Sequence, residues 1–292
     1  MRGIRIGSAF GIPIRLDLTF LLVLPLFAWL IGSDIASLTG VVNDLFGSVI
    51  DPDVLTAGSM QWVLGSAAAI GLFLCVLLHE FGHSLVAMRY GYEIESITLW
   101  LFGGVARFTQ MPEDWRQELT IAIAGPVVSL GLGVVASLGF LLLPTALDPV
   151  KFVVGYLALT NVVLAVFNML PGFPMDGGRV LRALLARSRP HAQATKIAAE
   201  VGKVFAFLLG IFGLFTNLLL IALAFFIYIG ASSEAQQTVM KAAFEGVSVT
   251  DVMTRREDLH TVDTDTSVAE LLDRMFVDRH TGYPVLRNGR LV

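Results

Sequence analysis

The sequence predicts an α-helical polytopic membrane protein with about six transmembrane helices, short membrane-associated β-strands and a small separate C-terminal domain. Of its 292 residues, 55% are hydrophobic and 15% are charged. The mean hydropathy of +0.74 lies well above that of soluble domains. Several uninterrupted apolar runs are typical of integral membrane proteins. One cysteine, Cys75, excludes an internal disulfide and a cysteine-rich zinc site.

The apolar runs set the order of the elements. Alternating apolar and polar residues over 1–17 predict a short strand before the first span. Transmembrane segments are expected at about residues 18–31, 61–88, 119–143 and 152–170. Residues 32–60 form a connecting segment. Residues 197–228 are too long for one untilted span, and small and polar residues near their middle predict a tight helical hairpin, either two short spans or a re-entrant pair.

The segment from Tyr92 to Phe108 reads as a β-hairpin. Residues 92–99 alternate and are β-branched, which favours a strand, and residues 101–108 suggest a second strand after a glycine turn. Non-helical backbone at membrane depth needs shelter by protein or a water-filled cavity. Two readings stay open, because the hairpin could dip into the membrane or lie at its surface.

The second span carries His79-Glu80-Phe81-Gly82-His83, an H-E-x-x-H motif. Residues four apart share a helix face, so His79 and His83 point the same way and can hold Zn²⁺. Glu80 is placed to take a proton from a metal-bound water. Ionisable groups inside an apolar span are costly and mark function by default, whereas the alternative is two hydrogen-bonded core histidines.

A catalytic zinc site needs a third protein ligand, and Asp176 is the favoured donor. It follows a helix break at the membrane boundary, while the remaining histidines lie in polar segments: His191, His260 and His280. The alternative for Asp176 is an N-cap of the following helix. Cys75, one turn before His79, could be a fourth donor, but we expect a small buried hydrophobe.

With these ligands we expect hydrolysis of a peptide bond. Glu80 takes the proton of the attacking water and later delivers it to the leaving amine. The amide of Asn168 could bind the developing oxyanion, or it could be a polar residue that ends its helix. The edge of the 92–108 hairpin could receive an unwound substrate as an added strand, with Gly103 and Gly104 allowing close backbone approach.

Lysine and arginine residues set the orientation. If the N-terminus is cytoplasmic, so are residues 89–118, residues 172–196 and the tail, which hold nearly all Lys and Arg. The opposite face keeps Lys151. We therefore expect a multi-pass cell-membrane protein with six crossings and both termini in the cytoplasm.

These motifs resemble the site-2 protease family of intramembrane metalloproteases. The matching pieces are His79-Glu80-Phe81-Gly82-His83, Phe102-Gly103-Gly104 and the segment from Asn168 to Gly177 with Pro171, Pro174 and Asp176. The resemblance covers about residues 5–235. It implies one Zn²⁺ per chain on His79, His83 and Asp176, Glu80 as catalytic base, and cleavage of a transmembrane segment of a membrane-anchored protein.

Residues 247–292 resemble the start of a CBS domain, a small α+β fold. Residues 249–254 match its opening strand and turn, 268–275 its helix and 283–286 its next strand. The sequence thus divides into a protease core, residues 1–235, and a partial cytoplasmic CBS-like domain, residues 236–292, which stops before the final strand and helix. A completed CBS pair implies an adenine nucleotide as regulator and a homodimer through these domains.

The expected partners are therefore a transmembrane protein substrate and the lipid bilayer, with no nucleic acid. One alternative function is a membrane ion transporter or channel regulated by the CBS-like tail, because intramembrane His, Glu and Asp could line an ion path. It predicts inverted repeats or paired broken helices, and the sequence shows no convincing internal repeat.

Overall fold

A computed structural model of the chain describes residues 3–100, 103–109, 112, 114–244, 246–255, 258–278, 280 and 282–292. The chain divides into two compact units, residues 1–240 and residues 241–292. The predicted positions Leu101 and Phe102 lie outside the described residues.

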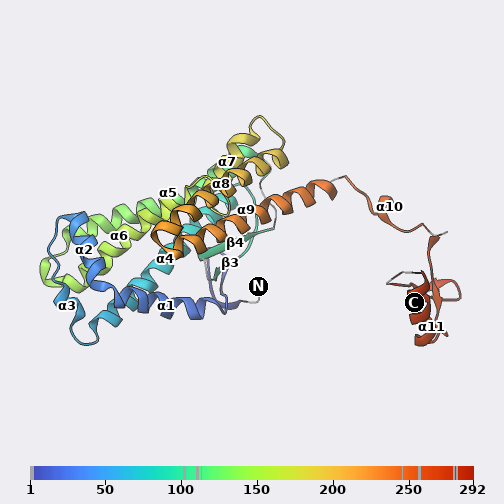
Figure 1. Ribbon diagram of the computed structural model, residues 1–292, viewed down its shortest axis with the longest axis horizontal. Coiled ribbons are helices and arrows are strands. Elements are labelled where there is room, and N and C mark those ends of the chain that lie inside the picture. Colours follow the sequence, from blue (N-terminus) through green and yellow to red (C-terminus); the bar gives the residue numbers. More distant parts are fainter. Residues whose placement is uncertain are drawn as a thin grey trace. The chain divides into compact units, whose positions relative to one another are not determined.

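The first unit is built mainly of helices (Figure 1). These are α1 (Phe20–Ser33), α2 (Ile35–Phe46), α3 (Pro52–Thr56), α4 (Met60–Arg89), α5 (Trp115–Leu142), α6 (Asp148–Asn168), α7 (Asp176–Ala186), α8 (His191–Thr216) and α9 (Leu218–Phe244), with a 3-10 turn at Thr145–Leu147. Within the described part of the chain, five helices are long and apolar enough to cross a membrane, and the pair α1–α2, bent by 72°, would make a sixth. The prediction of a polytopic helical protein is confirmed.

The segment between the first and second spans is more ordered than expected. It contains α2 and α3, although the sequence was expected to give only a connection over residues 32–60. One face of α2 is buried and contains Ile35, Thr39 and Val42. This helical spacing is hard to recognise in the sequence because polar residues lie between the buried ones. Helix α3 begins with Pro52 and is capped by the side chain of Asp51, a standard helix start.

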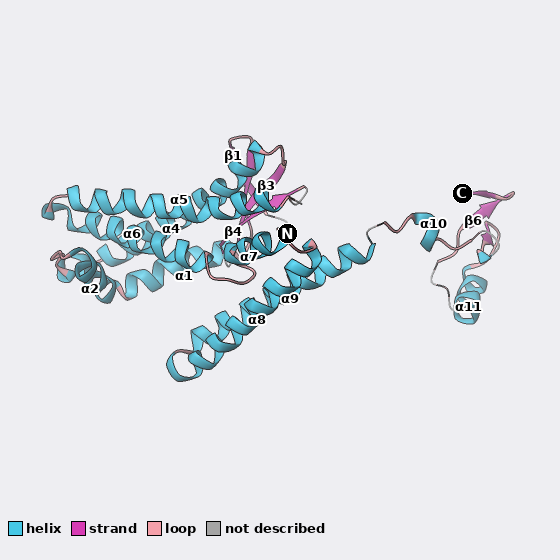
Figure 2. Ribbon diagram, turned by 90° about the horizontal axis from the view of Figure 1, so that it is seen from above, coloured by secondary structure: helices cyan, strands magenta, loops and turns pink. Residues whose placement is uncertain are grey.

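The predicted hairpin over residues 197–228 is confirmed, but its helices are not short. They have 26 and 27 residues and meet at Asn217, whose backbone is extended. Figure 2 shows the pair leaving the bundle of α1, α4, α5 and α6 at an angle, with the turn between α8 and α9 at the far end. Helix α9 continues to Phe244 because the polar residues after Gly230 include several good helix formers, so the change in composition does not end the helix.

Four strands form a sheet in the order β1 (Ile4–Ala9), β2 (Ile12–Leu16), β3 (Ile94–Trp100) and β4 (Gly103–Phe108). Strands β2 and β3 are parallel and the other pairs antiparallel. The N-terminal segment thus forms two strands, joined at Phe10 and Gly11, which both have positive φ. The two strands expected within residues 92–108 are confirmed, and β4 lies at an edge of the sheet.

The sheet packs onto the helix that carries the histidine motif. Ile12, Ile14 and Ile97 form a buried cluster with Phe81 of α4. Burying these apolar side chains fixes the sheet beside the C-terminal half of α4. Strand β4 consequently lies next to the motif, as the contacts of Gly104 with Glu80 show.

The second unit is a small α+β domain. It contains α10 (Val249–Val252), β5 (Val262–Asp263), α11 (Val268–Asp278), β6 (Val285–Arg287) and β7 (Arg290–Leu291), with sheet order β5-β6-β7. The expected helix at 268–275 and strand near 285 are confirmed. The opening strand at 249–254 is wrong, because Ser248 and Asp251 form a capping box that starts a helical turn there.

Candidate metal centre

Helix α4 presents two histidines side by side. His79 and His83 are each 3% exposed, and their Nε2 atoms lie 3.1 Å apart. One helical turn separates the residues, so the rings reach the same point from one face. The two imidazoles therefore share a buried position next to α5.

Asp176 is brought to the same point from α7. Its Oδ2 lies 3.1 Å from Nε2 of both His79 and His83. The N-cap of α7 is Met175, so the alternative reading of Asp176 as an N-cap does not describe this structure. Burial raises the pKa of the Asp176 carboxyl, but in their protonated form the adjacent His83 and His79 rings outweigh burial and hold that pKa well below its usual range.

Two glycines allow α7 to begin at this position. A Cβ on Gly177 would lie 2.2 Å from the carbonyl oxygen of Leu170, and a Cβ on Gly178 would lie 2.5 Å from the carbonyl carbon of Gly172. Any side chain at either position would push α7 away from the preceding loop. The Asp-Gly-Gly sequence is thus a packing requirement for placing the carboxylate.

The second nitrogen of each ring is held by α5. His83 Nδ1 lies 2.7 Å from the carbonyl oxygen of Ile121, which can only accept, so Nδ1 carries the proton. The lone pair of His83 is then on Nε2, toward His79 and Asp176. His79 Nδ1 lies 2.9 Å from the hydroxyl of Ser129. Such partners orient metal-binding imidazoles and fix their tautomer.

The donor set fits a zinc-type ion. The three atoms lie within 4.8 Å of one another, and ligands of tetrahedral Zn²⁺ are spaced about 3.3 Å apart, given Zn–N bonds of about 2.0–2.1 Å. Space around the rings depends on Gly125 of α5, because a Cβ there would lie 2.2 Å from His83 Nε2 and 2.7 Å from His79 Nε2. Three protein donors leave a further position open for water, as in catalytic zinc sites.

Glu80 lines a cavity of about 430 Å³ together with the donor residues His79, His83 and Asp176. Its side chain packs on strand β4, where a Cβ on Gly104 would lie 2.4 Å from Glu80 Cγ. The cavity wall is shared by α4, β4, the C-terminal end of α6, α7 and α9. A carboxylate beside the donor atoms, in a cavity large enough for a peptide segment, is arranged for general base chemistry.

Asn168 also lines this cavity, at the last residue of α6. Its Nδ2 donates one hydrogen bond to the carbonyl oxygen of Leu164, with a distance of 3.0 Å between the two atoms. An amide nitrogen carries two hydrogens, so one donor is left over. The structure places Asn168 at the end of its helix and in the wall of the cavity, and its role as an oxyanion donor stays a prediction.

The other candidates stay outside the donor group. His191 is 3.7 Å from Glu118, and His260 is 3.4 Å from Asp278 in the second unit. His280 stacks near His260 with ring centroids 4.8 Å apart. Cys75 is a buried free thiol. It is not part of the group of metal donors found among the described residues. The expectation of a structural Cys75 agrees with this placement.

Sequence reasoning missed a charged network beside the cavity. Arg182 of α7 is 3% exposed and donates from Nε to Glu118 Oε1 at 2.7 Å and from Nη1 to Glu234 Oε1 at 2.6 Å. These residues join α5, α7 and α9. The only sequence signal was an isolated Glu118 at the start of an apolar span, and a charge at such a place implies a partner.

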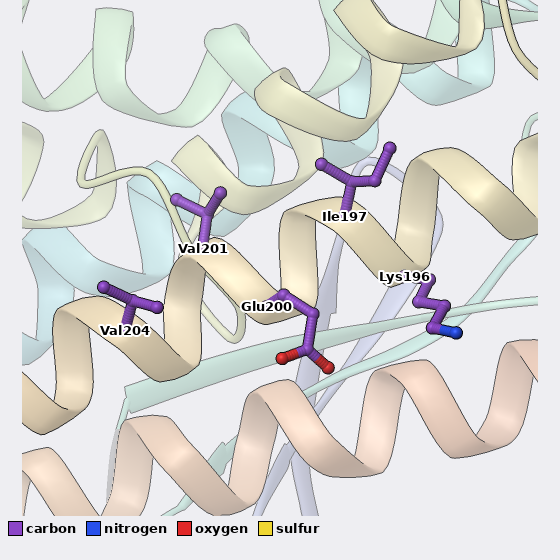
Figure 3. Close-up of a pocket in the computed structure, with 5 residues that line it drawn as sticks. All are labelled: Lys196, Ile197, Glu200, Val201 and Val204. Atoms are coloured by element: carbon purple, nitrogen blue, oxygen red, sulfur yellow. The ribbon is translucent and has the colours of Figure 1, made fainter.

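A second cavity, of about 390 Å³, lies on α8 and holds no comparable donor set (Figure 3). Three of its lining side chains are aliphatic: Ile197, Val201 and Val204. Its charged residues are Lys196 and Glu200, and a single carboxylate offers no group of three metal donors. Of these two cavities, the one between α4 and α7 holds the group of three metal donors found among the described residues.

The fold and the site together define a class: a polytopic membrane protein with a buried metal-type centre and an adjacent carboxylate, as in metal-dependent hydrolases. A family profile described as peptidase family M50 matches residues 67–148 and 143–209, and a CBS domain profile matches residues 249–292. The chain belongs to this family, the site-2 protease family of metalloproteases, and carries a CBS domain.

Relatives extend the match over nearly the whole chain. A zinc metalloprotease of Methanocaldococcus jannaschii is 38% identical over 295 residues, covering 99% of this chain and 76% of the relative. Rip3 of Mycobacterium tuberculosis is 33% identical, covering 97% of this chain and 71% of Rip3. A solved structure, the site-2 protease from Methanocaldococcus jannaschii, is 35% identical with a TM-score of 0.54, covering 80% of this chain and 95% of that one. Membership of this family favours a peptidase over the alternative of a channel.

Proposed function

We propose that this protein is an intramembrane zinc metalloprotease that cleaves a peptide bond within or near a transmembrane segment of a membrane-anchored protein. The observation that carries the proposal is the convergence of His79, His83 and Asp176 within 4.8 Å, beside Glu80, on an apolar helix. An ionisable cluster of this kind is costly inside a membrane and implies a function.

The roles of the residues follow from their positions. His79, His83 and Asp176 would hold one Zn²⁺ per chain, which when bound polarises a carbonyl and lowers the pKa of a coordinated water to about 7. Glu80 accepts a proton from the attacking water and passes it to the leaving amine nitrogen as the C–N bond breaks. The free amide hydrogen of Asn168 is available to the developing oxyanion.

Strand β4 is proposed to hold the substrate. It lies at the edge of the sheet, and Gly103, Gly104, Val105, Ala106 and Phe108 all line the cavity. A substrate must leave its helical form to expose a carbonyl, and an exposed strand edge can pair with such an extended segment. A proline at Val105 should therefore reduce cleavage while zinc content is kept, and unchanged turnover would refute this part.

The membrane orientation is proposed from the charges. Helix α4 ends at Arg89, and the segment of residues 179–203 carries six further arginine and lysine residues, whereas Lys151 lies at the start of α6. The positive-inside rule then places both termini in the cytoplasm of a cell-membrane protein. Residue-specific labelling of single cysteines at Arg189 and Lys151 should mark opposite faces in sealed cells.

The C-terminal domain is proposed to regulate access to the cavity. CBS domains pair, and a completed pair implies a homodimer and an adenine nucleotide as its ligand. Titration of the full chain with ATP and AMP should change the cleavage rate without changing zinc content. An unchanged rate across the titration would rule out nucleotide regulation of this chain.

The central test is Glu80→Gln in the purified full chain. We expect cleavage of a model single-span substrate to be lost while one zinc per chain is retained. Glu95→Gln is the matched control, because Glu95 is an exposed residue of β3 and should keep wild-type turnover. Cleavage by the Glu80 variant at the wild-type rate, or a wild-type protein that binds no zinc, would contradict the proposal.

A further inference from the structure

Arg179 is a charged residue of the catalytic cavity to which the proposed chemistry gives no role. It lies three residues after Asp176 on α7, and residues at this spacing share a helix face. Its side chain accordingly lines the same cavity as His79, His83 and Glu80. A cation at this position faces whatever occupies the cavity.

Two of its three guanidinium nitrogens, Nε and Nη2, are buried and find no hydrogen-bond partner among the residues that the structure describes. Leaving charged donors buried and unpaired is costly, and an orphaned group of this kind in a native structure calls for an explanation. The N–H groups of Nε and Nη2 point from the same edge of the planar guanidinium group, where they form the parallel fork that matches two oxygens at once.

Arg182 lies one turn further along α7 and, unlike Arg179, is paired with carboxylates of the described residues. Its Nε and Nη1 are bonded to Glu118 and Glu234, so each of these donors has a carboxylate. Its guanidinium also stacks on Phe173, 5.0 Å from the ring centroid. The two arginines share a helix and a cavity, but Nε and Nη2 of Arg179 have no hydrogen-bond partner among the described residues.

The guanidinium of Arg179 lies over an aromatic ring of the sheet. Its Cζ lies 5.6 Å from the ring centroid of Phe108, the last residue of β4. Stacking on an aromatic face orients a guanidinium without using its N–H groups. Arg179 is thus held in the cavity wall beside Phe108, at one end of the strand edge that is proposed to bind the substrate.

We propose that the Nε–Nη2 fork of Arg179 is a carboxylate-binding subsite of the catalytic cavity. A single carbonyl oxygen would satisfy one N–H of the fork, whereas a carboxylate presents two oxygens at matching spacing. The proposal rests on the proposed function, since it takes the cavity to be the place where substrate and product lie.

Two sources supply this chemistry. One is an acidic side chain of the substrate near the scissile bond. The other is the product itself: when the oxygen of water joins the carbonyl carbon and the C–N bond breaks, the amine takes a proton and the N-terminal fragment ends in a carboxylate. Arg179 would then act in substrate selection in the first case, and in product retention in the second.

Binding of small peptides to the purified full chain with zinc tests the subsite by calorimetry. The first probe pair is an N-acetylated apolar tripeptide with a free C-terminal carboxylate and the same peptide as its amide. The second pair is amidated at the C-terminus and carries either a central glutamate or a central glutamine. We expect the wild-type protein to prefer the acid in at least one pair by about 10- to 100-fold, the range of hydrogen bonds to a charged group.

The variants separate the fork from general charge effects. Arg179→Gln should reduce the preference to below about 3-fold, while Arg179→Lys, which keeps the charge and loses the fork, should retain an intermediate value. Arg189→Gln is the matched control, because it removes an equal charge at an exposed position outside the cavity lining, and should keep the wild-type preference. All variants are measured with zinc bound, so that any binding of a peptide carboxylate to the zinc is the same in every variant.

If the preference for the acid is lost in Arg179→Gln for the first pair, the subsite binds the product carboxylate. If it is lost for the second pair, the subsite binds an acidic side chain of the substrate. A preference that survives Arg179→Gln in both pairs, or a wild-type protein with no preference in either, overturns the subsite. These failures leave zinc binding and loss of cleavage in Glu80→Gln untouched, so they are distinguishable from failure of the proposed function.

Discussion

Gly125→Ala changes one hydrogen of α5 to a methyl group at the centre of the donor cluster. The added Cβ would stand 2.2 Å from Nε2 and 2.6 Å from Cε1 of His83, and 2.7 Å from Nε2 of His79. Ordinary contacts to a Cβ begin near 3.4 Å. The His83 ring would therefore have to withdraw by more than about 1 Å, or α4 and α5 would have to separate.

A shift of this size is large for a metal centre. Metal–ligand distances are held within about 0.2 Å, and disturbing the groups that orient the ligands reduces metal affinity by about 10- to 100-fold. We expect Gly125→Ala to lower zinc affinity by at least this factor. Overpacking should also destabilise the protein, by about 1–3 kcal/mol.

Zinc affinity is measured by competition with a chelator on purified protein, with circular dichroism as the check on helix content. Gly131→Ala is the matched control, since it lies on the same helix and its added Cβ would meet nothing within 4 Å. It should bind zinc like the wild type and gain slightly in helix stability. Wild-type zinc affinity in Gly125→Ala would refute the position of the donor cluster against α5.

Three further substitutions probe the surroundings of the site. Ser129→Ala removes the partner of His79 Nδ1, and chelator competition should show about 10- to 100-fold weaker zinc binding. Gly104→Ala would place a Cβ 2.4 Å from Cγ of Glu80, so the initial rate of cleavage should fall at least tenfold, by our estimate from general base catalysis, with zinc content unchanged. Arg182→Met leaves the buried carboxylate of Glu118 without the guanidinium that pairs with it, and thermal unfolding in detergent should report a loss of about 3–5 kcal/mol.

The metal centre was predictable to the extent that its geometry is local. His79 and His83 lie one turn apart on a single helix, so their spacing alone places them together. Asp176 could be proposed only by elimination, because nothing in the spacing of residues 83 and 176 requires them to meet. Ser129 and Gly125 carry no such sign, since a serine and a glycine in an apolar span are ordinary helix-packing residues until the neighbouring helix is known.

In the fold, too, the elements with a local sequence pattern could be predicted and those that depend on tertiary packing could not. Apolar runs marked the long spans because lipid demands a continuous hydrophobic length. Helix α2 was missed because its buried residues follow a helical spacing among polar neighbours, in a segment without a long apolar run. Helix α9 runs past the end of the apolar run at Tyr228, because polar residues can end a membrane span without ending a helix.

The close contact of α4 with α5 explains why the donor cluster and the helix packing are inseparable. A Cβ on Gly82 would lie 2.8 Å from the carbonyl oxygen of Ala124, so the two backbones touch at the level of the histidines. Helix association in lipid depends on such small-residue contacts, because lipid and apolar side chains are equally hydrophobic. The same approach brings the Ile121 carbonyl within 2.7 Å of His83 Nδ1. A substitution that separates α4 from α5 must therefore release His83, and metal binding becomes a direct measure of whether these two helices are in contact.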